Sequence, residues 1–238
     1  MITRTTKTAP LTYARVAGVL YLSLVPLAFF GFPFGPSHLF VPGDAATTAN
    51  NIIASEWLFR LSIVINLLGA IINALVVLAL YKLLKVVNKN MASLMVIFLL
   101  LSVRIGMLNE LNHMADLLLL SDANYLTSFT ASQLQALALF FHDLHKYGLT
   151  IAEVFWGLWL FPMGYLVFKS EFLPRILGAL LIIGCFGYLT VSLAAFLLPN
   201  YSVDFLRFAA VGEVLLPLGL VIKGINIEQW EKRAAESA

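Results

Sequence analysis

Charged residues are scarce in this sequence. They make up 12% of the 238 residues, whereas 61% are hydrophobic, and a soluble domain usually carries about 25% charged residues. The mean hydropathy of +0.90 agrees with this imbalance. An ordinary water-soluble domain is therefore excluded. The sequence also lacks a basic patch, a glycine-rich phosphate loop and a Ser-His-Asp set, so we expect no nucleic-acid partner.

Cysteine is almost absent, because Cys185 is the only one. A single cysteine excludes a disulfide framework within the chain. Cys185 lies inside an apolar run, where we interpret it as a small packing residue.

What the sequence does contain is a series of long, unbroken apolar runs. A transmembrane helix needs about 20 mostly apolar residues, and unbroken runs do not fit the alternating pattern of a β-barrel. The sequence predicts an all-α, polytopic membrane helical bundle with six transmembrane helices, and residues 1–238 form a single integral-membrane domain. The expected spans are 11–34, 57–84, 91–120, 134–168, 172–198 and 205–222.

The basic residues indicate the orientation of these spans. Lys and Arg concentrate at both chain ends and in the second and fourth linkers, and the first, third and fifth linkers have none. Because cytoplasmic loops carry the excess of Lys and Arg, we expect both termini to be cytoplasmic. The expected location is the inner (cytoplasmic) membrane, with the lipid bilayer as the main partner and a homo-oligomer as an open alternative.

Two local features add detail to this arrangement. Asp44 follows Gly43 and is a good N-cap, so we expect a short helix on the outer surface before the second span. Gly178, Gly184 and Gly187 in the fifth span are expected to allow close packing of helices.

The stretch FFHDLHKYG, residues 140–148, places four titratable side chains in a predicted span. At about 1.5 Å per residue this span is longer than the hydrocarbon core of about 30 Å. We therefore expect His142, Asp143, His145 and Lys146 to stand at the outer interface, where they meet water or headgroups. Helical spacing also places them, with Glu153, on one polar face.

Four charged residues are expected at greater depth: Arg104, Glu153, Arg207 and Glu213. An unpaired charge at mid-membrane costs at least about 2.5–3.5 kcal/mol, so pairing is expected. Arg104 lies about 20 Å and Glu153 about 23 Å from the inner ends of their spans, which favours a pair between them. Together with Glu110, Asn66 and Asn73, the four charged residues form the expected polar core or ligand-binding site.

A metal site is a second interpretation of the polar residues. His113 and Asp116 lie at the level of His142 and His145, and imidazoles with carboxylates are ligands of zinc. A bound water could then be activated for hydrolysis, with Glu110 or Glu153 as general base. His-x-x-Asp and His-Asp-x-His are weak signals compared with established zinc motifs. Haem held by His113 and His145 is a further alternative.

Four segments together resemble a known family. They are ARVAGVLYL, VPGDAATTANNIIASEWLFRL, LQALALFFHDLHKYG and LVFKSEFLPRILGALL. The chain, from about residue 14 to residue 223, resembles the bacterial integral-membrane proteins of domain-of-unknown-function family 4386. The resemblance implies a six-helix membrane protein, and it implies no reaction, ligand or catalytic residue.

Three functional hypotheses follow from the residues. The first is a non-catalytic protein whose polar core binds a small ligand or takes part in transport, since intramembrane ionisable residues indicate function. The second is a metal-dependent intramembrane hydrolase with a His/Asp site near the outer surface. The third is a structural bundle whose charges fix helix register. The first is favoured, which makes enzymatic activity the less favoured reading.

Overall fold

The computed structural model describes residues 3–30, 36–121, 123–198 and 200–237. Its elements are α1 (Thr3–Phe29), η2 (Pro36–Leu39), α2 (Ala45–Ala54), α3 (Glu56–Leu84), α4 (Lys89–Leu119), η3 (Asn124–Leu126), α5 (Ala131–Lys169), α6 (Arg175–Leu197), η4 (Asp204–Val211), α7 (Gly212–Ile222) and α8 (Ile227–Glu236), where η marks a 3₁₀ helix. The all-α fold class is confirmed.

The membrane spans agree with the sequence prediction. Among the described residues, six segments are long and apolar enough to cross a membrane: Pro10–Leu27, Glu56–Leu84, Lys89–Leu119, Ala131–Lys169, Arg175–Leu197 and Asp204–Ile222. The protein is thus a multi-pass membrane protein. The predicted end of the first span, residues 31–34, lies outside the described residues.

The chain divides into two compact units. Unit 1 contains Met1–Leu24, Ile72–Val103 and Thr150–Ala238, and unit 2 contains Val25–Ile71 and Arg104–Leu149. Helices α1, α3, α4 and α5 contribute residues to both. A single domain over the whole chain stays a prediction.

Local capping explains where several helices begin. Asp44 accepts a hydrogen bond from the backbone N–H of Thr47 at 2.9 Å and starts α2, which confirms the short helix expected there. Thr130 and Gln133 form a reciprocal pair at the start of α5: each side-chain oxygen accepts from the other's backbone N–H, at 3.3 and 2.8 Å. This capping box satisfies donors that a helix start leaves without partners.

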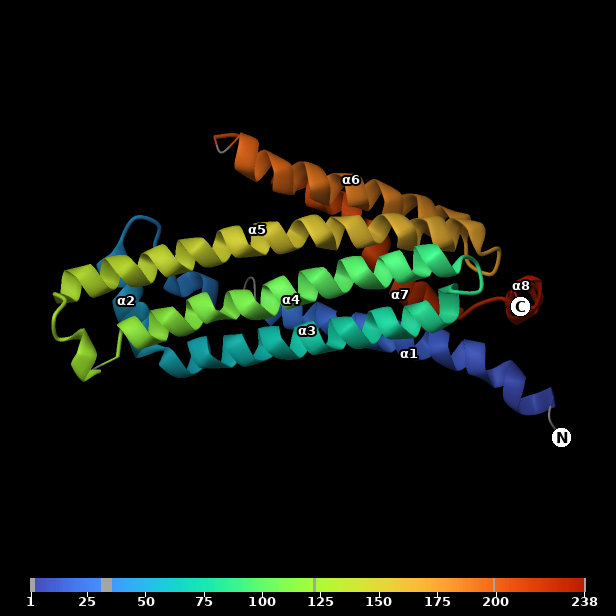
Figure 1. Cartoon of the computed structure of the whole chain (residues 1–238), viewed down its shortest axis with the longest axis horizontal. Helices are drawn as coiled ribbons and strands as arrows, with labels where there is room; N and C mark the ends of the chain where they lie inside the picture. Colours follow the sequence, from blue (N-terminus) through green and yellow to red (C-terminus); the bar gives the residue numbers. More distant parts are fainter. Residues whose placement is uncertain (1–2, 31–35, 122, 199, 238) are drawn as a thin grey trace. The chain divides into compact units, whose positions relative to one another are not determined.

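Unit 1 is held together by glycines that let backbones approach. A Cβ on Gly178 of α6 would lie 2.5 Å from the backbone nitrogen of Phe168 in α5, and one on Gly187 would lie 2.7 Å from the carbonyl oxygen of Leu206 in η4. At Gly184 the nearest atom, Ala210 Cα, would be 3.2 Å away. The close packing expected of these three glycines is confirmed, and η4 and α7 run back beside α6 (Figure 1).

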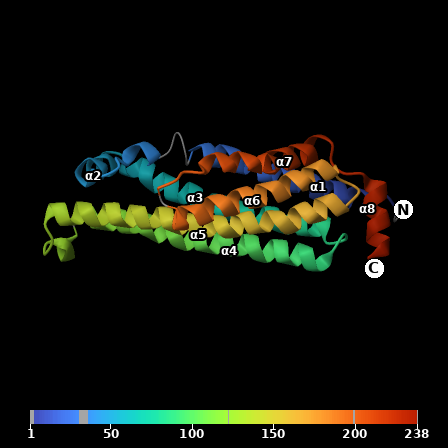
Figure 2. The same ribbon diagram turned by 90° about the horizontal axis from the view of Figure 1, so that it is seen from above.

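The last helix of unit 1 was not among the sequence predictions. Helix α8 runs across the direction of α6 and α7 (Figure 2). Trp230 attaches it by donating from its indole nitrogen to the Leu83 carbonyl at 3.0 Å. Arg233 pairs with Glu171 at 3.1 Å.

Unit 2 has a small apolar core of its own. Leu39 from η2 and Ile52 from α2 pack with Phe59 and Ile63 of α3 and with Leu117 of α4. The segment from η2 to α2 is braced internally, because the side-chain amide of Asn51 donates to the Leu39 carbonyl at 3.1 Å. This core packs α3 against α4, which carries three side chains of the cluster described next.

A buried histidine and carboxylate cluster

Five titratable side chains meet in the interior of unit 2. Their exposed fractions are 6% for Glu110, 5% for His113, 0% for Asp116, 7% for His142 and 4% for His145. The first three repeat at three-residue intervals along α4, and the two others do so on α5, which places each set on one helical face. We call these five residues the histidine cluster.

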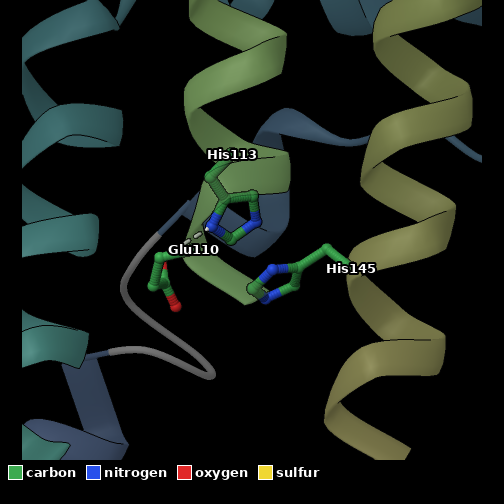
Figure 3. Close-up of side chains that lie close together, drawn as sticks. All are labelled: Glu110, His113 and His145. Carbon is green, nitrogen blue, oxygen red and sulfur yellow. Dashed lines mark hydrogen bonds and ion pairs between the residues drawn. The ribbon is translucent and has the colours of Figure 1, made fainter. Parts of the chain in front are cut away.

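Glu110 orients the imidazole of His113. Its Oε2 lies 3.1 Å from His113 Nδ1, and its Oε1 accepts from the side-chain amide of Asn66 at 3.0 Å. Figure 3 shows the contact with His113, and with the bond from Asn66 both carboxylate oxygens are engaged. A proton on His113 Nδ1 is held by this contact, which leaves Nε2 with a free lone pair for a ligand.

Asn109 holds His145 in a similar way. The Nδ1 atom of His145 lies 3.2 Å from the Asn109 carbonyl oxygen and 3.1 Å from its side-chain nitrogen, which also donates to the His145 carbonyl at 2.8 Å. The tautomer with a proton on Nδ1 donates to the carbonyl oxygen and again frees Nε2. The His145 ring stacks on His113 with ring centres 3.6 Å apart (Figure 3).

Asp116 and His142 contrast with these satisfied residues. Among the residues that the structure describes, neither carboxylate oxygen of Asp116 nor Nδ1 of His142 has a hydrogen-bond partner, although all three atoms are buried. Burying a carboxylate without a partner is costly, and buried polar groups in proteins are normally paired. A metal ion is one partner that these buried donor atoms, beside two imidazoles, could bind.

The distances fit metal coordination. One ligand atom from each of His113, Asp116 and His142 lies within 4.8 Å of the others, and Glu110, His113 and His145 form a second such set. Phe40 covers His142 with stacked rings 3.3 Å apart, and Phe59 meets His113 edge-on at 5.1 Å. The cluster therefore has an apolar wall that separates it from solvent.

The stretch FFHDLHKYG is divided between two environments. Asp143 and Lys146 are exposed and pair with each other at 2.9 Å, but His142 and His145 are buried. The expectation that all four meet water or headgroups was wrong for the two histidines. The 100° step of a helix separates the pairs, because residues 142 and 145 turn inward and residues 143 and 146 turn outward.

The deep charges of unit 1 form a different group. Arg207 donates from Nε to Glu153 Oε1 at 2.8 Å and from Nη2 to Oε2 at 3.1 Å, and its Nη1 binds Asp204. Ser192 adds a hydrogen bond to Glu153 at 3.3 Å. The expected pairing of Glu153 with Arg104 was therefore wrong, since Arg207 is the cation that binds it. Arg104 is exposed on α4.

Glu213 has hydroxyl partners. The phenol of Tyr21 donates to its Oε1 at 2.5 Å, and that of Tyr188 donates to the same carboxylate. The two asparagines of the expected polar stripe separate: Asn66 binds Glu110 in unit 2, and Asn73 is a half-buried residue of unit 1. The sequence analysis missed Tyr21, Tyr188, Asn109 and Phe40, because ordinary apolar and polar residues in a span give no local signal.

Comparison with known proteins confirms the family that the four sequence segments resemble. The family described as "Domain of unknown function (DUF4386)" matches residues 16–224. The chain belongs to this family. An uncharacterised protein of Archaeoglobus fulgidus is 32% identical over 170 residues, which cover 71% of this chain and 86% of the relative. No solved structure matches the chain.

Proposed function

We propose that this DUF4386 protein binds a divalent transition metal, zinc by preference, in the histidine cluster of unit 2. His113, His142, His145 and Asp116 would be the ligands. The observation that carries the proposal is the Asp116 carboxylate, which is fully buried beside His113 and His142 and has no hydrogen-bond partner among the described residues.

The chemistry of the donors supports zinc. Zinc takes imidazole nitrogens and carboxylate oxygens in tetrahedral sites, and three imidazoles with one carboxylate provide four such donors. Glu110 and Asn109 would serve as orienting residues, because each holds the Nδ1 side of a ligand imidazole. Carboxylates and carbonyls in this position are the usual outer partners of metal-bound histidines.

Metal binding is favoured over hydrolysis because the two expected general bases, Glu110 and Glu153, already have hydrogen-bond partners. Hydrolysis needs a carboxylate that can accept a proton from a metal-bound water. Both oxygens of Glu110 are engaged by His113 and Asn66, and both oxygens of Glu153 are engaged by Arg207. The proposed site is thus one that binds a metal, while the oxygens of both expected bases already have partners.

Elemental analysis of the purified, detergent-solubilised protein tests the proposal. After loading with zinc and removal of free ion, we expect a single zinc ion per chain in the wild type and a loss of zinc in Asp116→Asn and His142→Ala. His38→Ala is the matched control, because His38 is an exposed histidine in η2 and its removal should leave zinc binding unchanged.

Two results would contradict the proposal. One is a wild-type protein that keeps no zinc, iron or manganese after loading. The other is an Asp116→Asn variant that binds as much metal as the His38→Ala control, since the orphaned carboxylate would then have no part in binding.

A further inference from the structure

Glu213 is a half-buried acid that the metal proposal does not use. It lies in the first turn of α7, nine residues before the end of that helix at Ile222, or about 14 Å along the helix axis. Because the hydrocarbon core is about 30 Å thick, Glu213 lies near its middle. An ionised carboxylate at that depth needs a compensating charge.

The cation of this region is already committed. Arg207 uses Nε and Nη2 on Glu153 and Nη1 on Asp204, so two carboxylates share its charge. Counting Glu213, three acids stand against one guanidinium in this part of unit 1. Glu213 is thus the acid that this ion-pair group does not neutralise.

The partners of Glu213 can accommodate a neutral acid. Tyr21 of α1 and Tyr188 of α6 face it with hydroxyl groups, which carry no charge. The charges of Glu153 in α5 and Arg207 in η4 act on the hydroxyl of Tyr188. The partners of Glu213 among the described residues are the two tyrosine hydroxyls. A hydroxyl can donate to a carboxylate, and it can also accept from a carboxylic acid.

We propose that Glu213 is a proton-binding site of this protein, which takes up a proton to become a neutral carboxylic acid within the membrane. One O–H bond forms on the carboxylate as one O–H bond of a hydronium ion breaks and leaves water, and the charge of the side chain changes from −1 to 0. The ligand class is the proton itself, and the tyrosine hydroxyls hold the acid in place. This site is separate from the histidine cluster, whose residues all belong to unit 2.

Infrared spectroscopy of the protein in lipid nanodiscs tests this proposal. A protonated carboxylic acid has a carbonyl-stretch band that a carboxylate lacks. At neutral pH we expect this band in the wild type, its loss in Glu213→Gln and its retention in Glu228→Gln, which removes an exposed acid of α8.

A second pair of variants keeps the test decisive if Glu213→Gln does not fold. Tyr21→Phe removes the hydroxyl that lies 2.5 Å from Glu213, so the same band should move to higher frequency. Tyr125→Phe makes the same change at an exposed residue of η3 and should leave the band in place. If neither Glu213→Gln nor Tyr21→Phe alters a carboxylic-acid band at neutral pH, Glu213 does not bind a proton there.

Discussion

Gly148, the last residue of FFHDLHKYG, gives the sharpest test of how unit 2 holds its cluster. A Cβ at this position would overlap the Oδ1 and Cγ atoms of Asn109 and would lie 2.9 Å from its Nδ2 atom. Asn109 is buried and cannot move freely, since its amide nitrogen binds His145 and its Oδ1 accepts from Asn112 at 2.8 Å. We expect Gly148→Ala to displace this side chain and to loosen His145.

The size of the effect follows from the bonds that would be lost. Two hydrogen bonds of the Asn109 side chain are at stake, one to the His145 carbonyl and one from Asn112. At a net value of about 0.5–1.5 kcal/mol each, their loss costs about 1–3 kcal/mol. Alanine recovers about 1 kcal/mol through its better helix propensity. The net expectation is a destabilisation of up to about 2 kcal/mol.

Gly106→Ala provides the control within the same unit. A Cβ at Gly106 of α4 would meet no atom within 4 Å, so we expect this change to be neutral or to stabilise the helix by up to about 1 kcal/mol. Thermal unfolding in detergent, followed by tryptophan fluorescence, would compare the two variants. Equal shifts in the same direction would refute the assignment of Asn109 as the residue that Gly148 accommodates.

Three further predictions concern other parts of the chain. The hydrogen bonds from Thr47 hold the pKa of Asp44 below its ordinary value of 3.8. The stabilisation of α2 by Asp44 is therefore complete above pH 3.8 and is lost as the pH falls through the lower pKa of the folded state. We expect Asp44→Ala to lower the unfolding temperature at neutral pH and to lower it less in strong acid. Gly178→Ala should destabilise the contact between α5 and α6 by about 1–3 kcal/mol, because its Cβ would meet backbone atoms at 2.5 and 2.6 Å, and unfolding in detergent compared with Gly69→Ala would show it. Phe40→Ala removes the ring stacked on His142, so a chelator should strip zinc faster than from Phe129→Ala, which changes an exposed phenylalanine.

The membrane spans could be predicted because they depend on the length and hydropathy of each segment alone. A run of about 20 apolar residues is long enough to form a transmembrane helix, whichever helices it packs against. The six helices of the structure agree with the six expected runs. Asp44 and the three glycines of α6 are similar cases, since an N-cap and a close approach depend on residue type at one position. Helix α8 was missed because its ten residues are too short and too polar to stand out by hydropathy.

The partner of Glu153 could not be predicted from the same kind of reasoning. Depth along the span places Arg104 at about 20 Å and Arg207 at about 22 Å, against about 23 Å for Glu153, so depth does not separate the two arginines. The choice depends on which helices are neighbours and how each is rotated, and one apolar helix face resembles another in sequence. The structure decides it because glycines bring η4 against α6, and α6 against α5, which carries Glu153.

The two units differ in the side chains that surround a carboxylate without a cationic partner. Each contains a carboxylate that lacks a cationic side chain of its own, Asp116 in unit 2 and Glu213 in unit 1. Around Asp116 the neighbours are two imidazoles, His113, whose Nδ1 side is turned toward Glu110, and His142, whose Nδ1 has no partner among the described residues; this arrangement suits a metal ion. Around Glu213 the neighbours are phenols, which are poor ligands for zinc but can exchange hydrogen-bond roles with an acid. The neighbours of each carboxylate thus favour a different cation, a metal ion in unit 2 and a proton in unit 1.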